Sequence, residues 1–167
     1  MSETKVLLVY YSRSGNTAKL ADLLARELQC DTEQVQDVRS RQGLFGWLRS
    51  GFEAARKRLP AIQEPKHNPT DYELVIIGTP VWASTMSSPM RSYLNRYRER
   101  LPTQLAFFRT MAGNDPGRTF AEMAAFCSSP ALATLAVTQA ALNQNTVECQ
   151  EFLTRIRARL EGRGSTS

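Results

Sequence analysis

The sequence predicts an α/β fold in which a doubly wound sheet of five parallel strands is covered by helices on both faces. Short apolar runs alternate along the chain with segments of helical periodicity. The clearest run, residues 74–78 (LVIIG), is continuously apolar rather than alternating. Such runs are typical of strands that are buried on both faces of a parallel sheet. Right-handed crossovers between such strands leave few topologies to consider.

The first half of the chain contains two expected strands and two expected helices. A strand is expected over residues 5–11, followed by a helix over 16–28 and a weaker strand over 32–38. Residues 43–58 favour a second helix, with one apolar face expected to cover the sheet. The apolar residues of that face are Leu44, Leu48, Phe52, Ala55 and Leu59.

The second half continues the alternation. Strands are expected at 74–78, 104–108 and 132–137, and a helix follows Pro89. The run Asn114-Asp115-Pro116 has the form of a helix cap with proline in the first turn. A last helix is expected up to Leu160, and residues 162–167 form an expected frayed tail of a single domain spanning 1–167.

Composition limits the functional classes. A chain of 167 residues with 42% apolar and 22% charged residues is globular rather than disordered. No apolar run is long enough to span a bilayer, and no signal-peptide pattern is present. The lone histidine, His67, argues against a histidine-based metal site, and we expect neither a metal nor a nucleic-acid partner. Three widely spaced cysteines favour a reducing, cytoplasmic location.

The turn after the first strand is rich in small polar residues. Its sequence, SRSGNT at 12–17, places hydroxyl groups and a glycine at the start of a helix. Free amide groups and the helix dipole at such a terminus attract anions. A structural turn needs only one capping residue, so we favour phosphate binding over a purely structural role.

Two further turns follow strands that should end at the same edge of the sheet. Ligands in such folds bind beyond the carboxyl ends of the strands. Residues 78–86 place Trp82 there, either as a buried anchor or as a platform for a planar ring. Residues 110–114 are small enough for the backbone to approach the same ligand.

The chain resembles the flavodoxin-like family, and within it the short-chain bacterial FMN-binding proteins. The resemblance is carried by SRSGNT, by VIIGTPVWASTMSSPMRSYL and by AFFRTMAGNDPGRTFAEM, in the family's order and at the three turns. It implies strand order 2-1-3-4-5 and noncovalent FMN at the switch point; flavodoxin is itself the standard example of this topology.

The resemblance also implies the cofactor-binding residues, in three groups. The phosphate would be bound by Ser12, Arg13, Ser14, Gly15, Asn16 and Thr17. The ribityl chain and the ring would contact Thr79, Pro80, Val81, Trp82 and Ala83. The other side would be closed by Met111, Ala112, Gly113 and Asn114.

Two functions follow from the resemblance, and one alternative stays open. The chain would be an electron-transfer protein or a small FMN-dependent oxidoreductase, including a reductase of the NAD(P)H–quinone type. No residue is identified as a dedicated catalytic acid or base. Electron-carrier flavodoxins are strongly acidic, whereas this chain carries a net charge of +5, which puts a carrier role in doubt. The alternative is a flavin-free phosphate-binding or interaction module. The redox partner or small-molecule acceptor and a homodimer remain open.

The segment 43–58 allows a further alternative. Its apolar residues and its basic residues, such as Arg49 and Arg56, would suit a peripheral membrane contact. We favour the interpretation in which this helix covers the sheet, because that is the rule for amphipathic helices in such folds. In either case Phe45 and Trp47 could overhang the edge of the flavin.

Overall fold

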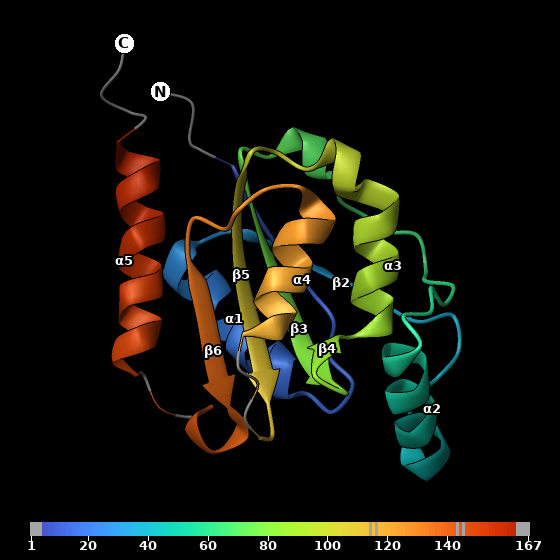
Figure 1. The fold of residues 1–167 in the computed structure, drawn as a ribbon. Coiled ribbons are helices and arrows are strands. Elements are labelled where there is room, and N and C mark those ends of the chain that lie inside the picture. The colour runs from blue at the N-terminus through green and yellow to red at the C-terminus, as the bar shows by residue number, and fades with distance from the viewer. Residues whose placement is uncertain (1–4, 114, 116, 143, 145, 163–167) are drawn as a thin grey trace.

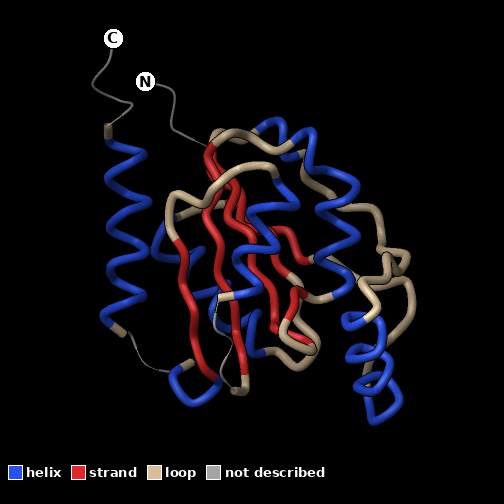
Figure 2. Tube along the Cα trace, in the orientation of Figure 1, coloured by secondary structure: helices blue, strands red, loops and turns tan. Residues whose placement is uncertain are grey.

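The fold is a central sheet between two layers of helices (Figures 1 and 2). The computed structural model describes residues 5–113, 115, 117–142, 144 and 146–162. Of the expected tail at 162–167, residues 163–167 lie outside these residues, as do Asn114 and Pro116.

The sheet confirms the predicted topology. Its strands run in the order β2-β1-β3-β5-β6, and every neighbouring pair along this path is parallel. Counted in chain order without β4, this is the order 2-1-3-4-5. The sequence analysis missed β4, which pairs antiparallel with the end of β3. The strands are β1 Val6–Tyr10, β2 Asp31–Gln34, β3 Leu74–Trp82, β4 Thr85–Met86, β5 Gln104–Met111 and β6 Thr134–Thr138.

The helices cover both faces of the sheet. One face packs against α1 and α5 through residues such as Leu24 and Phe152, and the other packs against α3 and α4 through Tyr93 and Met123. Helix α2 lies beside β3, β4 and α3 at the periphery (Figure 1). The helices are α1 Asn16–Leu28, α2 Gly43–Ala55, α3 Ser88–Tyr97, α4 Arg118–Cys127 and α5 Val147–Glu161, with short 3₁₀ turns at Pro69–Asp71, Arg98–Arg100 and Gln139–Ala141.

Three local expectations were wrong. The second strand ends at Gln34, and beyond it only an isolated bridge pairs Asp37 with Ile62. Helix α4 begins at Arg118, later than expected, although the Asp115 carboxylate still accepts hydrogen bonds from the first amides of the helix.

The third error concerns the face that α2 turns inward. The buried residues of α2 are Gly46, Ser50 and Ala54, whereas Leu44, Leu48 and Phe52 are exposed. The apolar periodicity identified the helix correctly but not its packed face.

None of the described helices combines the length and the apolar character needed to cross a membrane.

Candidate functional site

The three polar turns meet at the carboxyl edge of the sheet around a cleft of about 180 Å³. Ser14 from the first turn, Trp82 from the second and Met111 from the third all line it. Three lining residues were not among the predicted binding residues, although Trp47 had been considered as an overhanging side chain. The complete lining is Arg13, Ser14, Asn16, Thr17, Trp47, Pro80, Val81, Trp82, Thr110, Met111, Ala112 and Gln139.

The first turn ends at the N-terminus of α1, where backbone amides point toward the cleft without a side-chain cap. Gly15 precedes the helix with a φ of 93°, a conformation that favours glycine, and no side chain caps the helix. The amides of Asn16, Thr17 and Ala18 therefore have no intrahelical acceptor. The first turn contains no acidic residue, and Arg13 adds a positive charge beside the cleft. This arrangement suits a phosphate group.

Two hydroxyl groups of this turn form hydrogen bonds within the protein. The Ser12 hydroxyl accepts a hydrogen bond of 3.1 Å from the Gly15 amide. The Thr17 hydroxyl is buried and lies 2.7 Å from that of Thr110. Ser14 is exposed and lines the cleft, so its hydroxyl is the most accessible to a ligand.

The second turn is a hairpin that presents Trp82. Val81 and Trp82 pair with Met86 and Thr85, and the two residues between the strands, Ala83 and Ser84, both have positive φ angles. This is the geometry of a type I′ turn.

The hydroxyl of Thr79, a residue predicted to contact the ribityl chain, braces this hairpin. It is fully buried, accepts a hydrogen bond from the Ser87 amide at 3.0 Å and lies 3.1 Å from the Ser87 hydroxyl. Five of the predicted binding residues do not line the cleft: Ser12, Gly15, Thr79, Ala83 and Gly113. A sixth, Asn114, lies outside the described residues.

The ring of Trp82 is positioned by two neighbours. Its centre lies 5.5 Å from that of Tyr11 in an edge-to-face contact, and the guanidinium carbon of Arg41 lies 5.6 Å from it. Stacked guanidinium groups and edge-on aromatic rings both stabilise an indole.

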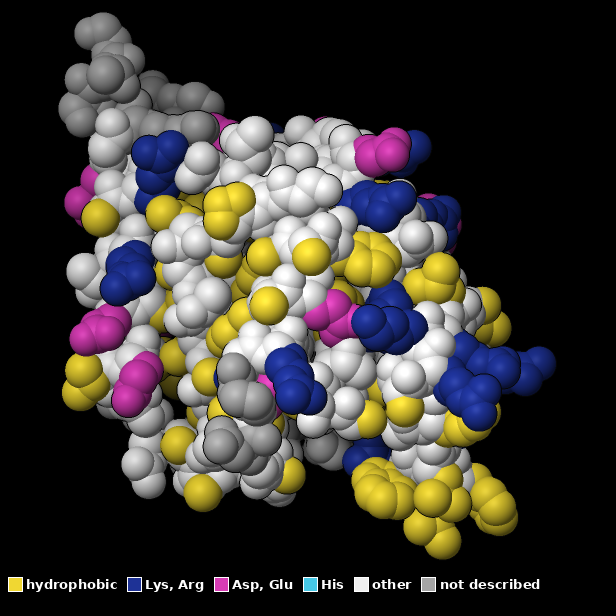
Figure 3. Space-filling view, viewed as in Figure 1, with side chains coloured by type: hydrophobic (Ala, Val, Ile, Leu, Met, Phe, Trp, Pro, Cys, Tyr) yellow, Lys and Arg dark blue, Asp and Glu magenta, His cyan; other side chains and the backbone are white. Residues whose placement is uncertain are grey.

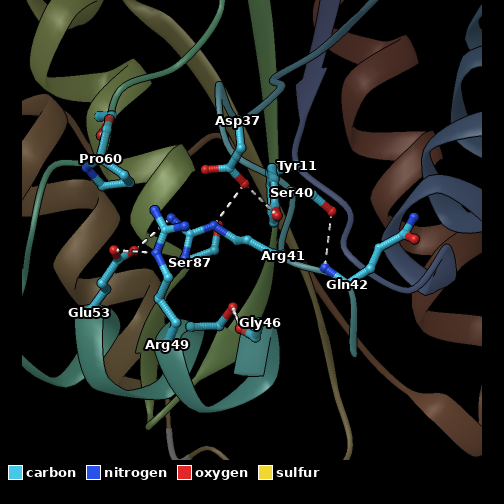
Figure 4. Close-up of polar contacts among 12 residues, drawn as sticks. Tyr11, Asp37, Ser40, Arg41, Gln42, Gly46, Arg49, Glu53, Pro60 and Ser87 are labelled. Carbon is cyan, nitrogen blue, oxygen red and sulfur yellow. Dashed lines mark hydrogen bonds and ion pairs between the residues drawn. The ribbon is translucent and has the colours of Figure 1, made fainter. Parts of the chain in front are cut away.

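Arg41 belongs to a buried ionic network that the sequence did not reveal (Figure 4). Its Nε donates to Asp37 at 2.7 Å, and its Nη2 lies 2.6 Å from a Glu53 carboxylate oxygen. The Tyr11 hydroxyl donates to the same Asp37 oxygen at 2.8 Å. Burial raises the pKa of Tyr11, and the nearby Asp37 charge raises it further, so this hydroxyl stays protonated. The network therefore fixes the end of β1, the start of α2 and Trp82 relative to one another.

A second network holds the other side of the hairpin. Glu122 of α4 accepts hydrogen bonds from the Thr85 hydroxyl, from the Met86 amide at 3.2 Å and from Arg91 at 2.7 Å. Burial alone would raise the pKa of Glu122, but the hydrogen bonds from Thr85, Arg91 and Met86 lower it overall. The carboxylate is therefore charged at neutral pH.

The third loop is anchored by a buried ion pair. Nη1 of Arg109 donates to the Asp115 carboxylate at 2.6 Å, and Nη2 donates to the Asp115 carbonyl at 2.8 Å. The guanidinium also lies 4.3 Å from the centre of the Phe120 ring. These contacts fix both ends of the segment that contains Met111 and Ala112.

A larger hollow of about 700 Å³ lies away from these turns, lined by residues that include Lys5, Asp31 and Leu160. It contains none of the predicted binding residues.

Comparisons with known proteins agree with this architecture. The family model described as Flavodoxin matches residues 5–147. A flavoprotein from Lactobacillus acidophilus solved in complex with FMN has a TM-score of 0.70 at 21% identity, covering 84% of this chain and 97% of that one. A candidate flavoprotein from Bacteroides uniformis has a TM-score of 0.74 at 18% identity, covering 90% and 99%.

The likeness extends to a named flavodoxin. The two-electron reduced flavodoxin of Megasphaera elsdenii has a TM-score of 0.59 at 16% identity, covering 90% of this chain and 96% of that one. A search of curated protein sequences finds no significant match.

Proposed function

Because the chain belongs to the flavodoxin family, we propose that it binds FMN noncovalently in the cleft and serves as a redox protein. The observation that carries this proposal is the meeting of the free N-terminus of α1 with Trp82 in one cleft. One end of the cleft suits a phosphate and the other suits a planar ring, and a flavin mononucleotide has both.

The amides of Asn16, Thr17 and Ala18, together with the Ser14 hydroxyl, would bind the phosphate. Arg13 would add charge. Trp82 would lie against the ring, while Met111 and Ala112 would close the opposite side. These residues fit the cofactor because they supply donors without any competing carboxylate in the lining.

FMN, when bound, supplies the electron-transfer chemistry, and the chain supplies position and environment. The described residues of the cleft include no Asp, Glu, His or Cys. This composition favours electron transfer over a reaction that needs a side-chain acid or base.

The position of the cleft at the edge of the sheet supports direct access of an electron acceptor to the flavin. The cleft is open at the carboxyl edge of the sheet, so one edge of a bound ring would face solvent. Trp47 borders that opening. A small acceptor such as a quinone would reach the flavin there, which supports a reductase role beside that of a carrier.

Titration of the purified protein with FMN and with riboflavin tests the proposal. Ser14→Ala should lower the affinity for FMN about tenfold to a hundredfold, because one hydrogen bond to a charged group contributes about 1.5–3 kcal/mol. Riboflavin lacks the phosphate and should be affected little. Trp82→Ala should lower the affinities for FMN and riboflavin alike, because both ligands contain the ring.

The control is Thr154→Ala, which removes an exposed hydroxyl on α5 and should leave both affinities unchanged. Failure of the parent protein to bind FMN, with retained binding of inorganic phosphate, would instead support a flavin-free phosphate-binding module.

A further inference from the structure

Helix α2 buries its small residues and exposes its large apolar ones. Phe45 is 87% exposed, Leu44 69% and Trp47 57%, and Leu48 and Phe52 are about half exposed. Gly46, Ser50 and Ala54, spaced four residues apart, form the buried side. Figure 3 shows the resulting apolar cluster at the tip of the molecule where Figure 1 places α2.

This orientation is fixed by close packing. A Cβ atom on Gly46 would lie 2.0 Å from the carbonyl oxygen of Arg41, so no larger residue can take its place without movement of the backbone. The Ser50 hydroxyl donates to the Gly46 carbonyl at 2.6 Å, and Glu53 pairs with the buried Arg41. The helix cannot rotate its leucines inward without breaking this network.

The surroundings of the apolar cluster are basic. Residues 38–62 contain six basic residues and one carboxylate, Glu53. Glu53 is largely buried and pairs with Arg41 and Arg49, so it offers little negative charge to a partner. Arg56, Lys57 and Arg58 are exposed at the C-terminal end of the helix. The guanidinium groups of Arg56 and Arg58 lie 5.0 and 5.5 Å from the Phe52 ring.

We propose that this surface, the α2 face, docks on anionic lipid bilayers. We define it as Leu44, Phe45, Trp47, Leu48 and Phe52 with Arg56, Lys57 and Arg58. An apolar helix face with aromatic and leucine side chains, bordered by arginine and lysine, is the pattern of interfacial membrane helices. Anionic headgroups would attract the basic residues while the apolar side chains enter the interface.

Charge favours a bilayer over a second copy of the chain. Two α2 faces brought together would place basic clusters side by side without an exposed carboxylate of this segment to pair with them. An anionic surface removes that repulsion. Because Trp47 belongs to both the α2 face and the cleft, docking would also place the mouth of the cleft beside the membrane.

Vesicle sedimentation tests the proposal without any redox reaction, so its outcome is separate from that of FMN binding. The full chain is mixed with vesicles of phosphatidylcholine alone or of phosphatidylcholine with phosphatidylglycerol. We expect binding to the anionic vesicles that falls as salt rises, because exposed charges are screened within about 8 Å at physiological ionic strength.

Two variants separate the apolar and the charged contributions. Phe45→Ser/Leu48→Ser should weaken vesicle binding at least tenfold for each residue removed, given the burial energy of these side chains. Arg56→Gln/Arg58→Gln should weaken it about thirtyfold, given the usual attraction of each basic residue to an anionic surface. All four residues are exposed, so thermal unfolding should confirm an intact fold.

Matched controls lie on the helices of the opposite face of the sheet. Val147→Ser, at a residue 71% exposed, and Arg26→Gln/Arg155→Gln should leave vesicle binding unchanged. The proposal is overturned if the parent fails to bind anionic vesicles, or if the α2-face variants bind as well as the parent. A dimer in sedimentation velocity that is lost in Phe45→Ser/Leu48→Ser, without vesicle binding, would assign the face to a second copy instead.

Discussion

The hydroxyl oxygens of Thr17 and Thr110 lie 2.7 Å apart, although the two residues are 93 positions apart in the chain. Thr17 lies in the first turn of α1, and Thr110 lies near the end of β5. Both are buried, at 1% and 4% exposure. Their hydrogen bond therefore joins the first and third turns of the cleft directly.

Thr17→Val should reduce the free energy of unfolding by about 1–3 kcal/mol, because it leaves the Thr110 hydroxyl buried without its partner. The double variant Thr17→Val/Thr110→Val should lose less than the sum of the two single variants, since replacing both partners by apolar groups can be nearly neutral. Urea unfolding of the four proteins measures the coupling. Simple additivity would show that the hydrogen bond contributes nothing.

Gly78 should not tolerate a side chain. A Cβ atom there would lie 1.9 Å from the tip of the Phe108 ring, which is fully buried in the sheet core. Gly78→Ala should therefore lower the free energy of unfolding by at least about 1–3 kcal/mol. Gly51 on α2 has open space around it, so Gly51→Ala should instead stabilise by about 0.5–1 kcal/mol. Equal thermal stability of the two variants would contradict the packing described for β3.

The Arg109–Asp115 pair should make stability depend on pH. Burial alone would raise the pKa of Asp115, but the hydrogen bonds from Thr119 and the charge of Arg109 lower it overall. A carboxyl group with a lowered pKa stabilises the fold above its unfolded pKa of about 3.9, and this stabilisation is lost as the pH falls through the folded value.

Asp115→Asn should therefore lower the free energy of unfolding by about 3–5 kcal/mol at neutral pH, as expected when a buried ion pair loses one partner. The difference in the free energy of unfolding between Asp115→Asn and the parent should shrink as the pH falls below about 4. Denaturant unfolding at several pH values checks this. Asp22→Asn, at an exposed position on α1, should change stability by less than about 0.5 kcal/mol at any pH. A constant difference between Asp115→Asn and the parent would count against the ion pair.

The parallel sheet and the meeting of the three turns could be predicted because continuous apolar runs such as 74–78 permit few other folds, whereas the strand order was implied by the resemblance to flavodoxins. The inward face of α2 could not. Leu44, Leu48 and Phe52 recur at the spacing of a buried face, yet the close approach of the Arg41 backbone admits only small residues. Apolar periodicity indicates that a helix has an apolar face, but it does not indicate which surface that face contacts.

The β3–β4 hairpin was missed for a different reason. Type I′ turns usually contain Asn-Gly, and here Ala83-Ser84 takes that place. Glu122, which holds the hairpin, lies in the distant helix α4, so its contribution depends on the tertiary fold, and Arg91 of the adjacent helix α3 pairs with it. The same applies to Arg41, whose position beside Trp82 follows from ionic contacts with Asp37 and Glu53.

The hairpin should become more stable when its turn receives residues suited to positive φ. Ala83 and Ser84 have φ angles of 49° and 59°, and each such residue costs roughly 1–2 kcal/mol. Ala83→Asn/Ser84→Gly should recover about 1 kcal/mol, since the greater freedom of glycine in the unfolded chain offsets part of the gain. For a chain of this size that corresponds to a Tm increase of about 2–4 °C.

Ala83→Val is the control, and its Tm should fall rather than rise. A β-branched residue is least suited to a positive φ angle. Trp82 precedes the turn and keeps its contacts with Tyr11 and Arg41, so FMN affinity should change by less than about threefold in the Asn-Gly variant. Calorimetry and FMN titration of the same samples give both values. If the Asn-Gly variant melts no higher than the parent while Ala83→Val is tolerated, the turn is not left-handed, and the placement of Trp82 must have another cause.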